Sequence, residues 1–153
     1  MPAREERIEI RCEAQEIFDL IHDYDRRLEW DSFLKKAGLL DGATKAGSGV
    51  HTLCIARNMI GGLAMEAIYI SYNPPRVAAI AMTRGPVFFK SFAATLLQKA
   101  VARGVTQVIY RYNFRTRPGW LSFLLDPIVE AVFSREVRSR LRGLKRVAES
   151  GTV

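Results

Sequence analysis

The chain has 153 residues, of which 48% are hydrophobic and 25% are charged. This composition is typical of a globular domain and excludes disorder, a coiled coil or a collagen-like chain as the overall class. The formal net charge is +7, which raises the question of a polyanionic partner such as nucleic acid or an anionic membrane. The charge is uneven, however: residues 1–75 carry 9 basic and 12 acidic side chains, whereas residues 76–153 carry 14 and 4.

The length predicts a single domain over residues 1–153, with an ordered core over about 5–149. The N-terminal segment is charged and lacks the apolar centre of a signal peptide, and no apolar run reaches the ~20 residues of a transmembrane helix. We therefore predict a cytoplasmic protein. Cys12 and Cys54 are interpreted as small buried side chains in a reducing compartment, with a disulfide or a metal pair as the alternative.

The spacing of apolar residues changes near residue 13, and this change predicts a strand followed by a helix. Polar and apolar side chains alternate over residues 7–12, which predicts a strand with one buried face. The period then becomes helical, which predicts a helix over about 14–23. The charged segment 24–33 follows, and we expect a short second helix or turn there that buries Trp30.

The middle of the chain is a series of strands separated by turn signals. The strands expected here cover residues 35–40, 50–58, 64–72, 77–84, 87–101 and 105–116. A glycine-rich connection over 41–49 and a turn over 59–62 lie on either side of the second of them. Connections this short favour an antiparallel meander.

The last of these strands, 105–116, shows the clearest alternation. One face carries Val108, Tyr110, Tyr112 and Phe114. The other face carries Arg111 and Arg115. We expect the aromatic face to point into the core and the arginines to point to solvent.

Residues 120–148 predict one long helix, bent at Pro127 or restarting there with Asp126 as its N-cap. Its first half is apolar over most of its circumference, and its second half is amphipathic. This helix is the only predicted element long enough to cover one face of the sheet. The space between helix and sheet is then either packed solid or kept as a pocket.

Several short segments occur in an order that is fairly specific. They are Ala14–Phe18, Asp23–Tyr24, Glu29–Phe33, Tyr72–Arg76, Gly85–Phe89, Tyr110–Phe114 and Arg135–Arg138 followed by Leu141 and Leu144. In this order the chain resembles the START and birch-pollen-allergen superfamily (SRPBCC proteins), which includes polyketide cyclases and aromatases. The resemblance covers about residues 5–149. It implies an α+β helix-grip fold, in which a curved antiparallel sheet of about seven strands wraps around a long C-terminal helix, with one or two short helices after the first strand.

By the same resemblance, such proteins hold a small apolar molecule between sheet and helix, and some catalyse cyclisation or dehydration there. We therefore predict binding or transport of a small hydrophobic ligand: a lipid, an isoprenoid or quinone, or an aromatic polyketide. The alternative is a cyclase or aromatase-type enzyme, in which Tyr or Arg side chains polarise a carbonyl and a His or Tyr moves a proton. A third interpretation is an interaction module whose cavity is closed by packing. No metal site is predicted, because no third or fourth ligand lies at metal spacing and the only histidines are His22 and His51. No cofactor or specific catalytic residue is predicted, because the known nucleophile, phosphate-loop and deaminase signatures are missing from the sequence.

Candidate cavity residues are aromatic or polar side chains of the strands and apolar side chains that open the last helix. They are Trp30, His51, Tyr69, Met82, Arg84, Phe88, Phe92, Tyr110, Tyr112, Phe114, Trp120, Leu124, Leu125 and Ile128. The enzyme alternative adds Arg57 and Glu66 as polar candidates. Each competes with ordinary packing or solvent exposure, and for Trp120 and Phe123 core packing is favoured over a lid or membrane-touching tip.

The basic half of the chain has three interpretations. Arg138, Arg142 and Arg146 recur at four-residue spacing on the outer face of the last helix, and a solvated face is favoured. Weak docking to an anionic membrane is the second, since each basic residue near such a surface contributes ~1 kcal/mol. Nucleic acid is not expected, because strand alternation separates the aromatic side chains of 105–116 from the arginines, and a stacking platform needs both on one face.

Overall fold

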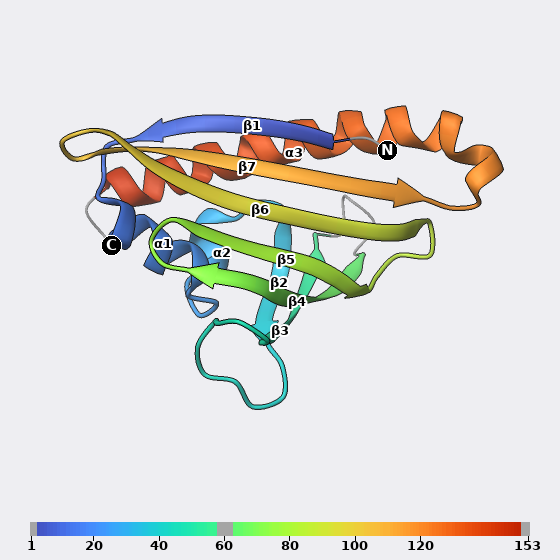
Figure 1. Cartoon of the computed structure of the whole chain (residues 1–153), viewed down its shortest axis with the longest axis horizontal. Helices are drawn as coiled ribbons and strands as arrows, with labels where there is room; N and C mark the ends of the chain where they lie inside the picture. The colour runs from blue at the N-terminus through green and yellow to red at the C-terminus, as the bar shows by residue number, and fades with distance from the viewer. Residues whose placement is uncertain (1–2, 58–62, 151–153) are drawn as a thin grey trace.

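One antiparallel sheet curls around one long helix in the computed structural model, which describes residues 3–57 and 63–150 (Figure 1). The elements are β1 (Ala3–Ile10), α1 (Ala14–His22), α2 (Arg27–Trp30), β2 (Leu34–Leu39), β3 (His51–Ala56), β4 (Ala64–Asn73), β5 (Val77–Arg84), β6 (Phe89–Ala102), β7 (Val105–Thr116), the 3-10 turn η2 (Gly119–Leu121) and α3 (Ser122–Glu149). The seven strands lie in the order β1-β7-β6-β5-β4-β3-β2. This is the α+β helix-grip fold that the sequence predicts.

The predicted boundaries agree with the observed ones to within a few residues. The strands at 77–84 and 105–116 have the predicted bounds, and α1 ends one residue earlier than expected. The predicted turn at 59–62, together with residue 58, lies outside the described residues.

Pro127 does not restart the last helix, so that alternative is wrong. α3 begins at Ser122 and continues through Pro127 to Glu149. Asp126 does not act as a cap, because its Oδ1 accepts a hydrogen bond from Thr116 Oγ1 at 2.6 Å, at the end of β7. Pro127 lies near the N-terminus of α3. Because proline has no backbone N–H, the helix loses one backbone hydrogen bond there and continues.

The core lies on the concave side of the sheet, against α3. The four residues predicted to face inward from β7 are all buried, and Phe114 and Tyr112 are almost completely so. Arg111 and Arg115 are exposed on the other face, as predicted. From α3, Val137, Leu141 and Leu144 complete the same core cluster.

The two halves of α3 have different surroundings. α1 and α2 pack against its C-terminal half, where Ser32 Oγ lies 3.1 Å from Ser139 Oγ. Neither short helix reaches the beginning of α3, and Trp120 and Phe123 are 76% and 73% exposed. The prediction that these two side chains pack in the core is therefore wrong, because nothing in the described chain covers them. Within residues 3–57 and 63–150, no helix is long and apolar enough to cross a membrane.

The backbones of α2 and α3 lie very close together at Gly143. A Cβ atom added there would lie 2.2 Å from the carbonyl oxygen of Trp30, which is backbone and cannot rotate away. Trp30 itself is buried, as predicted, and belongs to the main core cluster. Gly143 therefore permits the contact that closes this end of the sheet.

We expect Gly143→Ala to lower the free energy of unfolding by about 2 kcal/mol, because the steric cost of overpacking exceeds the helix propensity gained. Urea denaturation measures the change. Gly38→Ala is the matched control, since a Cβ at Gly38 meets nothing within 4 Å. Equal stability of the two variants would contradict the close contact.

Candidate functional site

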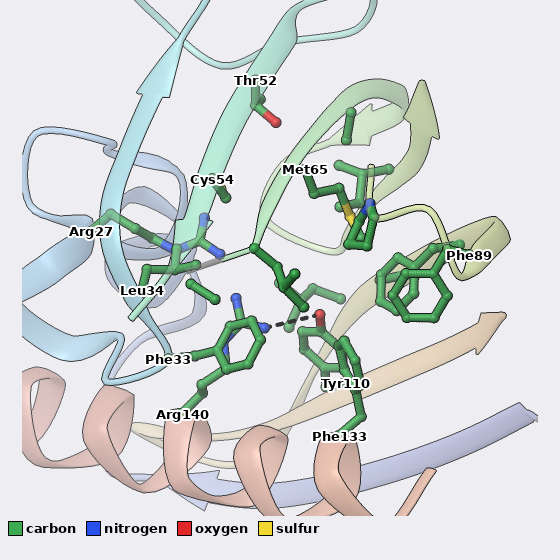
Figure 2. Close-up of a pocket in the computed structure, with 18 of the residues that line it drawn as sticks. Arg27, Phe33, Leu34, Thr52, Cys54, Met65, Phe89, Tyr110, Phe133 and Arg140 are labelled. Atoms are coloured by element: carbon green, nitrogen blue, oxygen red, sulfur yellow. Dashed lines mark hydrogen bonds between the residues drawn. The ribbon is translucent and has the colours of Figure 1, made fainter. Parts of the chain in front are cut away.

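A cavity of about 490 Å³ lies between the concave face of the sheet and α3 (Figure 2). Side chains from α1, α2, α3 and strands β2 to β7 line it. This volume lies within the range of small-molecule binding sites.

Small side chains on three neighbouring strands leave this space open. Ala67 on β4, Ala78 on β5 and Ala94 on β6 all point into the cavity and are themselves buried. Protein interiors are close-packed, so larger residues at these positions would fill the volume with their own atoms. The cavity is thus a direct consequence of which residues occupy the inward positions.

Aromatic side chains form the wall at one end of the cavity. The Phe133 ring of α3 lies 5.8 Å from the Phe89 ring and 5.5 Å from the Phe92 ring, both on β6. Met65 of β4 also lines the cavity and packs against the core cluster. This end offers an apolar ligand a continuous surface.

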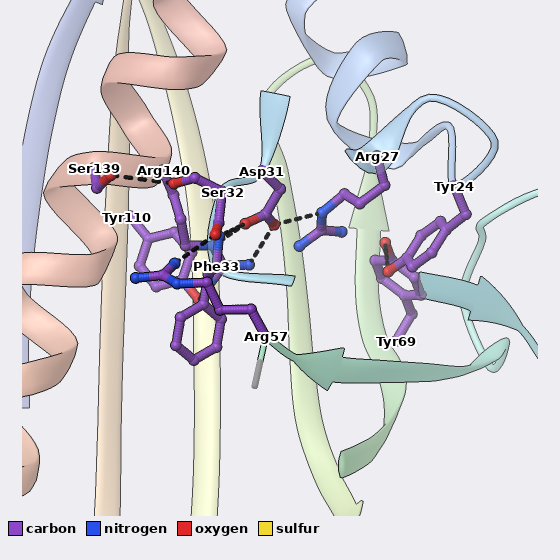
Figure 3. A network of polar contacts seen from close by, with 10 residues as sticks. All are labelled: Tyr24, Arg27, Asp31, Ser32, Phe33, Arg57, Tyr69, Tyr110, Ser139 and Arg140. Carbon is purple, nitrogen blue, oxygen red and sulfur yellow. Dashed lines mark hydrogen bonds and ion pairs between the residues drawn. The ribbon is translucent and has the colours of Figure 1, made fainter. Parts of the chain in front are cut away.

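A buried ion cluster forms the opposite end (Figure 3). Asp31, which is 1% exposed, lies between Arg27 of α2 and Arg140 of α3. Arg27 Nε donates to Asp31 Oδ2 at 2.9 Å. Arg140 donates from Nε to Oδ1 and from Nη2 to Oδ2, both at 2.9 Å, which is a bidentate arrangement.

The environment keeps all three groups charged. Burial alone would raise the pKa of Asp31, but the charges of Arg140 and Arg27 and their hydrogen bonds lower it overall. Burial lowers the pKa of Arg140, but the charge of Asp31, the nearby Tyr110 and the hydrogen bonds to Asp31 together raise it by more, so the net direction is upward. Aromatic faces hold the guanidinium groups as well: Arg27 lies 5.0 Å from the Trp30 ring centroid and Arg140 5.1 Å from that of Phe33.

A neutral hydrogen-bonded chain lies next to Arg27. Tyr69 Oη is 2.8 Å from His22 Nδ1 and 3.0 Å from Tyr24 Oη. Burial, and then the charge of Arg27, lower the pKa of His22 to about 3, so this histidine is neutral at physiological pH. Burial raises the pKa of Tyr69, so its hydroxyl keeps its proton.

Five of the sequence-predicted cavity residues do line the cavity. They are Tyr69, Phe88, Phe92, Tyr110 and Ile128. Their contact with a ligand stays a prediction.

The other nine predicted residues lie elsewhere. Trp30, Tyr112 and Phe114 are buried in the main core cluster, and Met82 packs against it. Tyr112 Oη lies 3.3 Å from Ser134 Oγ rather than in the cavity.

The remaining predicted residues lie outside the core. Arg84 has a side chain 83% exposed and lies 3.9 Å from Glu66. His51 of β3, Trp120, Leu124 and Leu125 are partly or fully exposed and do not line the cavity. Arg57, a candidate of the enzyme alternative, instead pairs with Glu136 of α3 at 3.1 Å.

Sequence reasoning missed the polar end of the cavity. Its members are His22, Tyr24, Arg27 and Arg140, with Asp31 buried behind the two arginines. One signal was present: Arg140 sits beside Leu141 and three residues after Val137, on the buried side of the last helix. A charged residue at a buried helical position is rare unless it is paired.

The chain matches the model of a known family over residues 1–149, described as polyketide cyclase/dehydrase and lipid transport. A comparison with curated proteins finds no match.

Solved structures share the fold at low sequence identity. The Zhui aromatase/cyclase from Streptomyces sp. R1128 is 16% identical with a TM-score of 0.80, and the match covers 99% of each chain. A START superfamily protein from Mycobacterium smegmatis is 11% identical with a TM-score of 0.78, over 98% of this chain and 99% of that one. Ara h 8.0201 is 10% identical with a TM-score of 0.74, over 98% and 99%. These likenesses show a common fold. The matched family model supports a role in ligand binding or polyketide cyclase-type chemistry.

We expect Asp31→Asn to lower the free energy of unfolding at pH 7 by about 3 kcal/mol or more, because two buried guanidinium groups lose their counterion. Because the pKa of Asp31 is lowered in the folded state, its contribution is present above pH ~4 and is lost as the pH falls below that value. Urea denaturation at pH 7 and pH 3 measures both effects. Glu66→Gln, which removes the partner of the exposed Arg84, is the control and should change stability by less than about 0.5 kcal/mol; similar losses in the two variants would contradict the assignment.

The neutral His22 predicts a pH dependence of its own. Its pKa is about 3 in the folded protein and about 6.5 in an unfolded chain, so the unfolded state binds the extra proton. Stability is therefore lost as the pH falls from about 6.5, by up to ~1.4 kcal/mol per pH unit. Between pH 6.5 and 4.5 the stability of a His22→Gln variant should depend less steeply on pH than that of His51→Gln, and parallel slopes would contradict a neutral buried His22.

Proposed function

The chain belongs to the polyketide cyclase/dehydrase and lipid transport family, and on this premise we propose that it binds a small hydrophobic molecule in the cavity between the sheet and α3. The observation that carries the proposal is a 490 Å³ space lined mainly by apolar and aromatic side chains. A lipid, an isoprenoid or quinone, or an aromatic polyketide fits this chemistry.

The arrangement of the cavity favours a ligand over closed packing. Alanine at three inward positions of adjacent strands leaves room that the surrounding phenylalanines do not fill. An apolar space gains little from water, which finds few hydrogen-bonding partners there, whereas an apolar ligand restores dispersion contacts with the walls.

The beginning of α3 offers a route for exchange with the surroundings. Ile128 lines the cavity and is also exposed at the surface. Val87, between the cavity-lining Pro86 and Phe88, is exposed as well. An opening between the β5–β6 connection and the first turns of α3 would let an apolar ligand meet apolar side chains on entry.

We expect Ala94→Phe to abolish binding of the neutral fluorophore N-phenyl-1-naphthylamine, because the added ring occupies the cavity. Ala93→Phe is the control. Ala93 precedes Ala94 in β6 and does not line the cavity, and strand alternation places it on the other face of the sheet, so this variant should keep the fluorescence increase. Native mass spectrometry of freshly purified protein tests the same proposal by detecting a co-purified molecule. Repeatedly empty spectra together with no fluorophore binding by the unmodified protein would overturn it.

A cyclase or dehydratase activity is the second candidate, favoured by the polar groups beside Arg27. A ligand carbonyl directed at this end would meet the Arg27 guanidinium and the Tyr69 hydroxyl, which is linked to His22. Such donors can polarise a carbonyl, and the contact with His22 orients the Tyr69 hydroxyl.

The enzyme proposal is tested with a synthetic poly-β-ketone thioester, whose cyclisation is followed by the absorbance of the aromatic product. Tyr69→Phe should lower the rate about 100-fold, while N-phenyl-1-naphthylamine affinity stays the same because the apolar wall is untouched. A rate equal to that without protein would contradict catalysis on this substrate class and leave binding as the function.

A further inference from the structure

We propose that the polar end of the cavity binds the carboxylate of an amphipathic acid through the two terminal nitrogens of Arg27. The apolar body of the acid then lies against the aromatic end, formed by Phe89, Phe92 and Phe133. This inference rests on the proposed function and adds the chemical class of the ligand. Two observations support it: the positive charge of the cavity lining, and the unused hydrogen-bond donors of the buried Arg27.

The cavity lining is positively charged. Arg27, Arg135 and Arg140 line it, and in the described part of the chain no Asp or Glu does so. Asp31 sits behind the two buried arginines and neutralises one of them, which leaves one surplus positive charge at this end. The nearby Cys54 adds no negative charge, because burial raises the pKa of its thiol.

The hydrogen bonds locate that surplus charge on Arg27. Asp31 already accepts four bonds: one from Arg27, two from Arg140 and one from the backbone N–H of Phe33 at 3.1 Å. A carboxylate has about four acceptor positions, so Asp31 has none left. Arg27 uses only Nε, and its Nη1 and Nη2 make no hydrogen bond to any of the described residues. The residue is 8% exposed and lines the cavity, so these donors face the space that a ligand would occupy.

Arg27 is held in place for such a contact. Its guanidinium lies 5.3 Å from the ring centroid of Tyr24 and 5.0 Å from that of Trp30, and Asp31 anchors its Nε. Figure 2 shows its guanidinium and that of Arg140 at one end of the pocket, with Phe89 and Phe133 toward the other. Arg140 Nη1 is 3.4 Å from Tyr110 Oη, and both atoms border the same end.

Two free, coplanar N–H groups match a planar carboxylate in a bidentate pair. One surplus charge balances a monoanion, whereas a phosphate monoester brings close to two negative charges into a buried site. A neutral alcohol or ester carries no negative charge, so its hydrogen bonds are weaker and the charge of Arg27 stays uncompensated. The site therefore favours a carboxylic acid over the other polar heads of equal chain length.

The experiment displaces bound N-phenyl-1-naphthylamine with dodecanoate, dodecanol, methyl dodecanoate and dodecyl phosphate at pH 8, each below its critical micelle concentration. We expect dodecanoate to displace the fluorophore at a concentration about tenfold lower than the alcohol and the ester, as a charged bidentate pair implies. Equal potency of acid and alcohol would overturn the inference and leave the proposed function standing, and a preference for the phosphate would also overturn it. Failure of the fluorophore to bind at all would instead overturn the proposed function.

Variants assign the preference to Arg27. In Arg27→Gln, dodecanol and dodecanoate should displace the fluorophore at nearly equal concentrations, instead of concentrations that differ about tenfold. The neutral fluorophore should still bind, because Asp31 keeps its pair with Arg140. Arg27→Lys keeps the positive charge but loses the two coplanar N–H groups, so the ratio of displacing concentrations should be intermediate. Arg84→Gln, at an exposed arginine away from the cavity, is the matched control and should keep the full ratio. An unchanged ratio in Arg27→Gln would overturn the assignment, and the ratio in the unmodified protein tests the preference even if that variant does not fold.

Discussion

The Asp31 carboxylate joins the two elements that close the sheet. It accepts hydrogen bonds from Arg27 on α2 and from Arg140 on α3, and thereby positions the short helix against the long one. Burying three ionised groups is costly unless each is paired and hydrogen-bonded, so this geometry tolerates little displacement. The close contact of Gly143 with the Trp30 carbonyl lies on the same interface, and the pairing of charges and the packing of backbone therefore reinforce each other.

The packing of α2 against α3 also determines where the cavity lies. Where α1 and α2 cover the C-terminal half of α3, the interior is packed by large side chains such as Trp30 and Leu144. Beyond that point, Ala67, Ala78 and Ala94 on the strands line the open cavity. The ion cluster borders one end of this space and the phenylalanines the other, so the lining is polarised along its length. A ligand with one polar head and one apolar body matches that division better than a uniformly apolar molecule.

The fold was predictable because its signals are local. The alternation over 105–116 and the period of 120–148 each depend on neighbouring residues. From them the buried face of β7 and the exposed face of α3 with Arg138, Arg142 and Arg146 were correctly assigned. The cavity was predicted less well because its lining combines residues from nine elements. Trp120 and Phe123 illustrate the limit: their apolar character suggested core packing, but burial depends on whether another element reaches them, and none in the described chain does.

The sequence alone determined the order of strands and helices, the inward aromatic face of one strand and the membership of a fold superfamily, since periodicity and short segments are properties of adjacent residues. Only the tertiary structure decided which charged side chains are buried together at the cavity. Asp31 and Arg140 are 109 positions apart in the chain, and no local pattern connects them. Folding brings them together next to Arg27, withdraws them from water and leaves one guanidinium with unused donors. That arrangement is set by the packing of α2 against α3, because the energy of a buried charge depends on its surroundings in space rather than on its neighbours in sequence.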